Sequence, residues 1–333
     1  MRDDSERKAV VYSSMPEGMA QRLSQAFTQK TGVKVEMVLE GTSWLLTRLR
    51  AERRRPIADV FMGAAGSVPA IVAAKEGLLE TYTPEGWQDL PLSESNLALR
   101  DEQWRWVGFA FAAMGLVYSE EYTSPVEAPK TWDELADPRW RGELTLWDPS
   151  VSGTATLFLV FSLQRLIHNG ANEDAAWEYL RGFYKNIKKY AEEGPPAFLV
   201  THGMVKVGVH LDNQYLYYVD AKSYGYEKLR FVLPEGSPVL TNPVCLVAGS
   251  SHALQGKMFI DFLLSPEGQA IVGMSFWVRS REGQIHLPQR HPYWARFDGK
   301  PAEVTKMAAN LDLGYMADNF DKARIHWQNY IED

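Results

Sequence analysis

Small and hydroxylated residues precede a predicted helix in the stretch "WDPSVSGTAT", which covers residues 147–156. A strand-like run, "GELTLW", ends there in Asp-Pro, and the apolar run "ATLFLVFSLQRL" follows. Ser and Thr at such a position commonly cap the helix by accepting hydrogen bonds from its backbone N–H groups. The unpaired N–H groups of a helix start can also bind an anion. Ser152, Gly153 and Thr154 are therefore candidates for either role.

Three loops in the first third of the chain have the same character. Each follows a strand-like run, contains small or hydroxylated residues and leads into a predicted helix. Because binding groups in α/β sheets lie at the carboxyl ends of the strands, these loops are expected to face a shared ligand. Four such loops favour an anion-binding site over four separate helix caps. The candidate ligand-binding residues of the three loops are Ser13, Ser14, Thr42, Ser43 and Ala65.

A fifth candidate place is "GVHLDNQYLYY", in which His210, Asp212 and Asn213 follow a strand-like run. Alternation along a strand places His210 and Asp212 on the same side as long as both belong to the strand. A carboxylate there accepts hydrogen bonds from ligand hydroxyl or amine groups, and a histidine adds a donor or a pH-tunable charge. The alternative is a structural histidine beside a surface aspartate.

The elements that position these residues alternate between strand and helix. Residues 9–13, 33–39 and 59–62 are strand-like, the segments after them have helical periodicity, and Gly32 is placed to end the first helix. Successive strand-then-helix units predict a mostly parallel sheet with helices on both faces. The apolar run 104–119 has no helical periodicity and leads into a second α/β set. The sequence therefore predicts an α/β fold with two lobes.

Composition excludes several classes of protein. The chain has 333 residues, a formal net charge of −7 and a single cysteine, Cys245. The acidic balance argues against nucleic acid as a main partner, because phosphates require a basic face. No apolar run reaches 18 residues, so no membrane span is expected. A single cysteine forms neither an internal disulfide nor a thiolate zinc cluster, and the known catalytic motifs are missing, so we expect no enzyme and no cofactor.

Four stretches resemble the periplasmic solute-binding proteins of ABC importers, in the type 2 group that includes ferric-iron and phosphorylated-sugar binders (extracellular solute-binding family 1-like). The most specific is "TWDELADPRWRGELTLWDPSVSGTA", which is similar to the family's T-W-x-D/E-L, K/R-G and D-P-x-x-S-G-T motifs. The other three are "YSSMPEGMAQRLSQAFTQKTGVKV", "ADVFMGAAGSVPAIVAAKEGLL" and "GKMFIDFLLSPEGQAIV". The likeness extends over most of the chain.

The resemblance implies a two-lobed α/β fold, the Venus flytrap, in which each lobe is a mixed, mostly parallel sheet flanked by helices. Two crossing strands join the lobes. Lobe 1 is then expected at residues 8–115 plus 240–333, with the last helices packed on it, and lobe 2 at residues 116–239. The family binds its ligand in the cleft between the lobes and closes on it by hinge motion. Trp147, directly before the loop at 148–154, is a further candidate for lining that cleft.

Tyrosines near residue 215 bear on the class of ligand. Ferric-iron binders of this family place adjacent tyrosines just after the corresponding strand, because phenolates suit Fe(III). Here the aligned positions hold Asn213 and Gln214, and the loop after the first strand has no His or Tyr beyond Tyr12. A small anionic organic ligand, with a phosphorylated one included, is the main interpretation; polyamines and unphosphorylated sugars stay open. If the alignment register differs, the metal ligands of an iron-binding alternative are Tyr215, Tyr217 and Tyr218.

The resemblance also implies the partners. An ABC permease in the inner membrane, or a sensor histidine kinase, is expected to dock on the closed protein, which is itself expected to be a monomer. The start, "MRDDSERKAVVY", lacks the apolar core of a signal peptide. The protein is therefore expected to be periplasmic, or lipid-anchored and extracellular, with its signal peptide missing from this sequence. The alternative is a cytoplasmic protein.

Overall fold

The computed structural model describes residues 7–63, 65–94, 96–188, 190–191, 194–220, 225–274, 278–279 and 309–330. The chain divides into two compact units. Unit 1 comprises Met1–Phe111 and Leu240–Lys306, and unit 2 comprises Ala112–Val239 and Met307–Asp333. None of the helices within the described ranges combines the length and apolar character needed to cross a bilayer.

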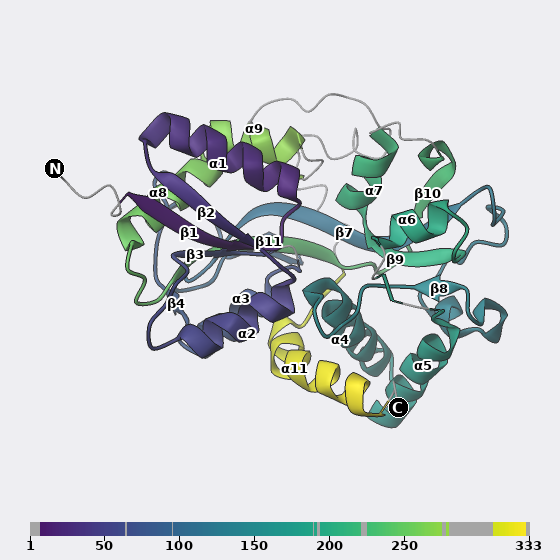
Figure 1. The fold of residues 1–333 in the computed structure, drawn as a ribbon. Coiled ribbons are helices and arrows are strands. Elements are labelled where there is room, and N and C mark those ends of the chain that lie inside the picture. Colours follow the sequence, from purple (N-terminus) through teal and green to yellow (C-terminus); the bar gives the residue numbers. More distant parts are fainter. Residues whose placement is uncertain are drawn as a thin grey trace. The chain divides into compact units, whose positions relative to one another are not determined.

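Unit 1 is built on a sheet whose first strands are parallel (Figure 1). β1 (Lys8–Ser13) lies between β2 (Lys34–Leu39) and β3 (Val60–Met62), and β11 (Val239–Val247) pairs antiparallel with β3. β1 and β3 are largely buried, as strands covered on both faces must be. β2 is the edge strand and keeps its charged side chains exposed, which protects the open edge. The short strands are β4 (Leu79–Glu80), β5 (Ser93–Glu94), β6 (Leu97–Ala98) and β12 (Val278–Arg279).

Helices cover both faces of the unit 1 sheet (Figure 1). One face carries α1 (Glu17–Thr31), α8 (Ala253–Leu264) and α9 (Pro266–Met274), and the other carries α2 (Thr42–Glu52) and α3 (Val68–Lys75). α1 ends as predicted, because Gly32 adopts a left-handed φ of 72° without steric cost. The ring of Phe27 lies 5.4 Å from Phe259 and 5.5 Å from Phe262, so an aromatic group fixes α1 on α8.

Unit 2 is organised around β7 (Val107–Ser119), the long apolar run, which begins in unit 1. There β7 pairs antiparallel with β9 (Val207–Leu211) and β10 (Leu229–Val232), and β8 (Leu144–Thr145) adds to β9 in parallel. Gly115 permits the close approach of β10, because a Cβ atom there would lie 2.5 Å from the ring of Phe231. The unit 2 helices are α4 (Gly153–His168), α5 (Glu173–Asn186), α6 (Pro196–Thr201), α7 (Asp212–Asp220) and α11 (Leu313–Tyr330). Short 3-10 helices are η2 (Asp133–Ala136), η3 (Pro138–Trp140) and η4 (Tyr226–Lys228).

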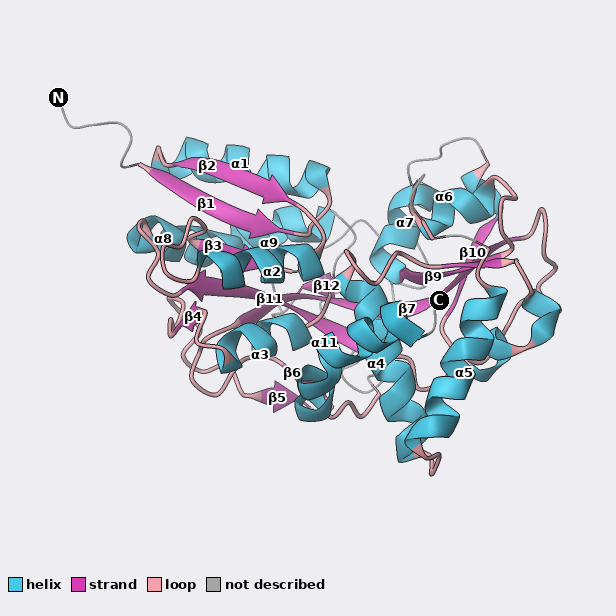
Figure 2. Cartoon of the chain, turned by 60° about the horizontal axis from the view of Figure 1, so that its bottom comes forward, coloured by secondary structure: helices cyan, strands magenta, loops and turns pink. Residues whose placement is uncertain are grey.

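The last helix, α11, packs on α4 in unit 2 (Figure 2). Its residues Met316, Phe320 and Trp327 are fully buried, and the Trp327 indole donates to the Tyr190 hydroxyl at 2.8 Å. His326 stacks on Trp177 of α5 at 3.8 Å. The prediction assigned residues 240–333 to lobe 1; the structure keeps Leu240–Lys306 in unit 1 but places Met307–Asp333 in unit 2. The physical reason is that α4 is apolar along most of its length and requires a cover, which α11 provides.

Candidate functional site

The loops after the first three strands meet in unit 1. Thr42 Oγ1 donates a hydrogen bond to Ser14 Oγ at 2.7 Å. A Cβ atom at Gly63, directly after β3, would lie 3.6 Å from the Thr42 methyl carbon. The Ser14 N–H donates to the Met62 carbonyl at 3.3 Å, which holds the first loop against the third strand. Ser14, Thr42 and Gly63 form what we call the strand-end cluster.

The helices that follow these strands begin without side-chain caps. The N-cap residues of α1, α2 and α3 are Pro16, Gly41 and Ser67, and none of their side chains accepts a hydrogen bond from its helix. The first N–H groups of a helix have no partner within the helix and carry the positive end of its dipole. Unit 1 thus presents helix starts that are chemically suited to an anion, next to the strand-end cluster.

Other predicted residues of unit 1 serve the local structure. Ser13 is fully buried, and its Oγ accepts the Met15 N–H at 3.1 Å, so the hydroxyl stabilises the turn after β1. Ser43 is 6% exposed and Ala65 is fully buried. Ser13 and Ala65 therefore have backbone groups, and no free side-chain group, to offer a ligand.

The start of α4 shows a conventional cap. Ser152 Oγ accepts the Ala155 N–H at 3.2 Å, and the Ser152 N–H donates to the Asp148 carbonyl at 2.9 Å. The hydroxyl and the N–H of Ser152 are therefore both bonded within the protein. The hydroxyl has the capping role that the sequence left open. Gly153 is buried and Thr154 half-buried, and their N–H groups are the first of the helix. Trp147 is half-buried at the beginning of the same loop.

Replacing the cap tests this assignment. Ser152→Ala is expected to lower the free energy of unfolding by about 0.5–2 kcal/mol, because the Ala155 N–H loses its acceptor. Urea denaturation followed by circular dichroism measures the change. Ser152→Asn keeps a side-chain acceptor and is the matched control, expected near the wild-type value. Equal stability of all three proteins would contradict the cap.

Polar side chains at the end of β9 are buried without partners. His210 is 2% exposed and Asn213 1% exposed, and neither imidazole nitrogen nor either amide atom has a hydrogen-bond partner. Burial lowers the pKa of His210 to about 3, so the ring is neutral at ordinary pH. Because β8 and β9 are parallel, the loop into α4 and the start of α7 lie at the same edge of the unit 2 sheet.

Asp212 is the first residue of α7 and lies outside β9, which ends at Leu211. Strand alternation would align it with His210 only if both belonged to the strand, and this condition is not met because β9 ends at Leu211. Asp212 is 2% exposed and its Oδ1 accepts the Asn213 N–H at 2.6 Å. Burial raises the pKa of Asp212 to about 8, although backbone N–H groups of Ala113 and Asn213 oppose the shift. We call His210, Asp212 and Asn213 the β9 polar cluster.

The three candidate tyrosines lie on α7, and the rings of Tyr217 and Tyr218 are in edge contact, with centroids 5.5 Å apart. Tyr215 stacks on Phe231, with ring centroids 5.5 Å apart, and Tyr218 stacks on Tyr226 at 4.9 Å. Tyr217 is 56% exposed. Burial raises the pKa of Tyr218 to about 12 and raises that of Tyr215, which disfavours the phenolate form that Fe(III) requires. Within the described part of the chain, no group of three or more His, Cys, Asp or Glu residues could hold a metal ion.

Two residues near the strand ends were not predicted from the sequence. Gly63 provides space beside Ser14 and Thr42. Asn242 on β11 is fully buried, and its Oδ1 accepts the Gly66 N–H at 3.4 Å, while its Nδ2 has no partner. The sequence signal that could have revealed Asn242 is its side-chain amide inside the apolar run "TNPVCLV", because a polar group in a buried strand requires a partner.

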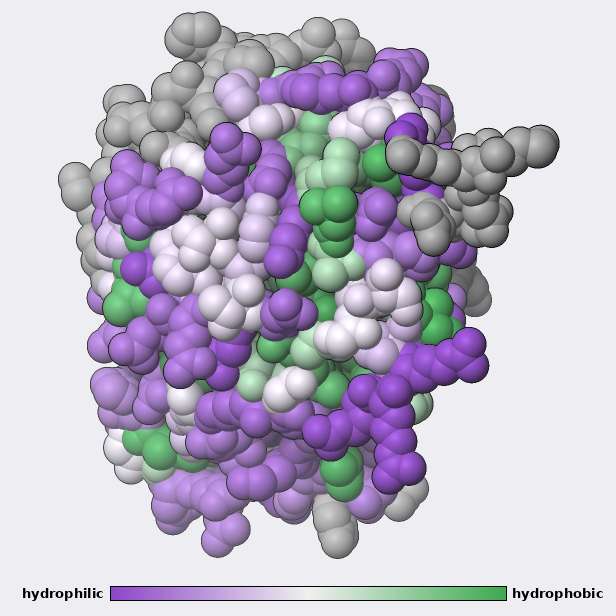
Figure 3. Space-filling model, turned by 90° about the vertical axis from the view of Figure 1, so that its left-hand side faces the viewer, coloured by the Kyte–Doolittle hydropathy of each residue, from purple (hydrophilic) through white to green (hydrophobic). Residues whose placement is uncertain are grey.

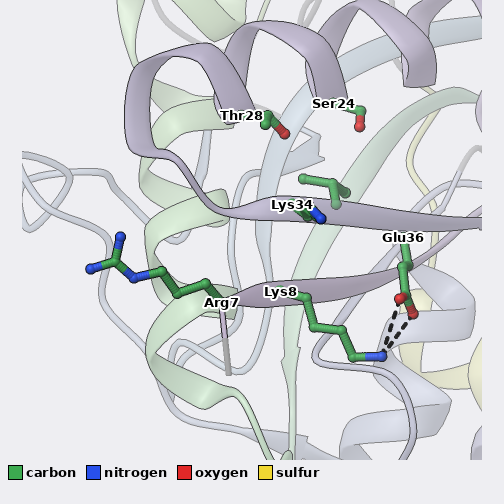
Figure 4. A pocket seen from close by; sticks show the side chains of 7 residues that line it. Arg7, Lys8, Ser24, Thr28, Lys34 and Glu36 are labelled. Atoms are coloured by element: carbon green, nitrogen blue, oxygen red, sulfur yellow. Dashed lines mark hydrogen bonds and ion pairs between the residues drawn. The ribbon is translucent and has the colours of Figure 1, made fainter. Parts of the chain in front are cut away.

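A separate pocket of about 520 Å³ lies at the opposite ends of the strands in unit 1 (Figure 4). α1 and the amino-terminal ends of β1 and β2 form it, and Lys8 pairs there with Glu36 at 3.0 Å. None of the predicted site residues lines it. The pocket is lined by Arg7, Lys8, Ser24, Thr28, Lys34, Val35 and Glu36. The face of the molecule drawn in Figure 3 is mostly hydrophilic, with smaller apolar areas between the polar groups.

Comparison with known proteins identifies the family. The model of the bacterial extracellular solute-binding protein family matches residues 55–276. An Fe(3+)-binding periplasmic protein of Serratia marcescens is 27% identical over 79% of this chain and 75% of its own length. A candidate 2-aminoethylphosphonate-binding periplasmic protein of Salmonella paratyphi A is 26% identical over 76% of this chain and 71% of its own. The periplasmic binding protein AfuA of Actinobacillus pleuropneumoniae, solved with fructose-6-phosphate bound, has a TM-score of 0.75, 22% identity and 98% coverage of both chains.

The chain belongs to the bacterial extracellular solute-binding protein family. The match confirms the predicted resemblance, and the structural likeness confirms the type 2 periplasmic-binding fold. The predicted class of function, solute binding for an ABC importer, is confirmed with it. The family model and the relatives reported above are named as binding proteins.

Proposed function

We propose that this chain binds a small organic anion in the periplasm and delivers it to an ABC permease. The observation that carries the proposal is the set of helix starts in unit 1 that lack side-chain caps, beside the strand-end cluster. Backbone N–H groups at such starts bind phosphate, phosphonate or carboxylate oxygens without a charged side chain. The first N–H groups of α4, in unit 2, have the same chemical character. A phosphorus-containing ligand is consistent with the names of two relatives.

Ferric iron is the second candidate, because a relative that is 27% identical over 79% of this chain is named as an Fe(3+)-binding protein. Against it stand the packing and the raised pKa values of Tyr215 and Tyr218. A hard trivalent cation requires several oxygen ligands converging on one point, and Tyr215 and Tyr218 each stack on a different aromatic ring. The organic anion is therefore the function that the described residues support better.

Native mass spectrometry of the purified protein tests the proposal. A ligand present at a hundred times its dissociation constant stabilises the complex by about 2.7 kcal/mol, and such complexes commonly survive purification. Denaturation then releases the bound molecule for identification. A phosphorylated, phosphonylated or carboxylated organic molecule supports the proposal. A bound iron ion, or a neutral or cationic organic molecule, overturns it.

The tyrosines provide a second test. Tyr217→Phe combined with Tyr218→Phe is expected to change the affinity for the recovered anion by less than about twofold, because aromatic packing is kept. Isothermal titration calorimetry measures this affinity, and titration with ferric citrate in parallel tests iron. Wild-type protein that develops the visible absorption band of a Tyr–Fe(III) complex, lost in the double variant, would establish the iron alternative.

The proposal also covers the oligomeric state, the localisation and the partner of the protein. The protein is expected to be a monomer that binds its ligand without converting it, and to be periplasmic or anchored by a lipid, as the periplasmic relatives suggest. A sensor kinase remains the alternative partner to the permease. Light scattering measures the oligomeric state, and growth of a deletion strain on the recovered ligand as sole source of its element separates transport from sensing.

A further inference from the structure

The chain carries a basic run that the solute-binding function does not use. The stretch "RLRAERRRP" covers residues 48–56 and leads from α2 toward β3. Within α2, Arg48 pairs with Glu52 at 2.7 Å, and Arg50 pairs with Glu76 at 2.7 Å. The three arginines that follow are exposed, and none of them has an ion pair among the described residues. They are Arg53, Arg54 and Arg55.

Strand pairing in unit 1 places these arginines beside two further cations. β1 and β3 are parallel, with Val11 opposite Val60, so the residues that precede both strands lie at the same edge of the sheet. β2 is also parallel to β1, with Lys8 opposite Lys34, and the Lys34 N–H donates to the Arg7 carbonyl at 3.0 Å. This edge therefore gathers exposed cations, which we call the basic edge: Arg7, Lys34, Arg53, Arg54 and Arg55.

The carboxylates of the same elements do not neutralise the basic edge. Glu36 of β2 pairs with Lys8 at 3.0 Å (Figure 4). Glu52 pairs with Arg48 within α2, and Asp59, directly before β3, is fully buried. In a chain with a formal net charge of −7, this edge is thus a local excess of positive charge. Such an excess attracts an anionic partner.

The pocket of about 520 Å³ lies on the basic edge. Arg7 and Lys34 line it together with Ser24 and Thr28 of α1 (Figure 4). Hydroxyl groups donate hydrogen bonds, and guanidinium and ammonium groups form charge-assisted ones with phosphate oxygens. The pocket therefore has the chemistry to receive a phosphate group.

Large apolar side chains are exposed at the same edge. Ile57, directly after the basic run, is 50% exposed, and Leu254, in the first turn of α8, is 68% exposed. The loop before α8 is held at the start of β3, because the His252 N–H donates to Asp59 Oδ1 at 3.1 Å. Figure 3 draws the face on which β1 and β2 begin and shows apolar areas between hydrophilic groups. Apolar side chains among cations are the combination with which proteins bind a bilayer interface.

We propose that the basic edge binds the surface of an anionic phospholipid bilayer, with Ile57 and Leu254 inserted between the headgroups and one headgroup phosphate in the pocket. A bilayer fits better than an acidic polypeptide for two reasons. The cations are spread over the starts of two strands and the loop before a third, which suits a broad surface of charge. The exposed apolar side chains gain from contact with lipid and gain nothing from a hydrated acidic chain. This inference goes beyond the proposed function and does not depend on the class of solute.

Co-sedimentation of the full chain with vesicles tests the inference. The probes are phosphatidylcholine vesicles with and without phosphatidylglycerol, at low and high NaCl. Binding is expected only to the vesicles that contain phosphatidylglycerol and is expected to fall steeply as salt is added. The triple variant Arg53→Gln, Arg54→Gln and Arg55→Gln is expected to bind them roughly 100-fold more weakly, because each cation near an anionic surface contributes about fivefold.

A matched control and a second variant make the test specific. The control triple variant is Arg141→Gln, Lys185→Gln and Lys188→Gln, which removes the same charge from exposed positions of unit 2 and is expected to bind as wild type does. Ile57→Ser combined with Leu254→Ser is expected to weaken vesicle binding roughly 10-fold without a change of charge. Thermal unfolding shows that each variant is folded.

Each alternative gives a different result. Equal binding to both kinds of vesicle, or binding to neither, overturns the inference. Equal losses in the two triple variants mean a general effect of net charge and overturn it as well. Polyglutamate that binds as tightly as the anionic vesicles, with no effect of the serine substitutions, indicates an acidic polypeptide partner in place of a bilayer. Binding of the recovered solute is expected to be unchanged in all variants, so these failures leave the proposed function standing.

Discussion

Thr154→Asp is expected to abolish binding of the anionic ligand while leaving the protein folded. Thr154 is half-buried in the first turn of α4, where a carboxylate is favourable for the helix because it faces the positive end of the dipole. The same carboxylate repels an anion bound at the helix start. At about 4 Å and an effective dielectric constant of about 20, two like charges repel by about 4 kcal/mol, which corresponds to roughly a 1000-fold loss of affinity.

The control for this experiment is Thr154→Asn, because asparagine has nearly the same shape as aspartate and carries no charge. We expect it to bind within about threefold of wild type. Calorimetry with the molecule recovered by native mass spectrometry measures both variants, and thermal unfolding without ligand shows that both are folded. Wild-type affinity in Thr154→Asp would place the anion elsewhere than the start of α4. Equal losses in both variants would mean that the hydroxyl of Thr154, and no charge effect, is responsible.

The contribution of the β9 polar cluster to the free energy of unfolding is expected to be highest between about pH 4 and pH 6.5. The folded-state pKa of Asp212 is raised from 3.8 to about 8, so its contribution is fully present below pH 3.8 and lost as the pH rises through 8. The folded-state pKa of His210 is lowered from 6.5 to about 3, so its contribution is present above pH 6.5 and lost as the pH falls through 3. Between pH 3.8 and 6.5 the two proton linkages oppose each other.

Asp212→Asn isolates one side of this profile. It is expected to raise the free energy of unfolding at pH 8 by roughly 2–5 kcal/mol relative to wild type and to have little effect below pH 4, because a buried amide carries no charge at any pH. Denaturant unfolding at unit pH intervals measures the difference between the two proteins. Glu227→Gln, which replaces an exposed carboxylate in unit 2, is the control and is expected to follow wild type. A difference that does not grow between pH 4 and pH 8 would show that Asp212 is ionised at neutral pH in the folded protein.

The sequence by itself determined the local elements and the loops that they position. Period-two and helical patterns predicted β1, β2, β3 and the helices between them, and Gly32 ends α1 as expected. Because parallel strands end at one sheet edge, the same patterns correctly placed Ser14 and Thr42 together. These features depend on residues close in sequence, where steric preference and alternation of burial act directly.

Only the tertiary structure decided which partner each element and side chain meets. The pattern of α11 requires an apolar partner but does not name α4, which lies far away in the sequence. The composition of the α4 loop allows a cap or an anion site, and the contacts of Ser152 assign its hydroxyl to the cap. Tyr215, Tyr217 and Tyr218 are close neighbours in sequence, but only the structure shows that Tyr217 and Tyr218 are in edge contact while Tyr215 stacks on Phe231. Whether a polar side chain such as Asn213 is buried, and whether anything bonds to it, is set by long-range packing that local sequence does not encode.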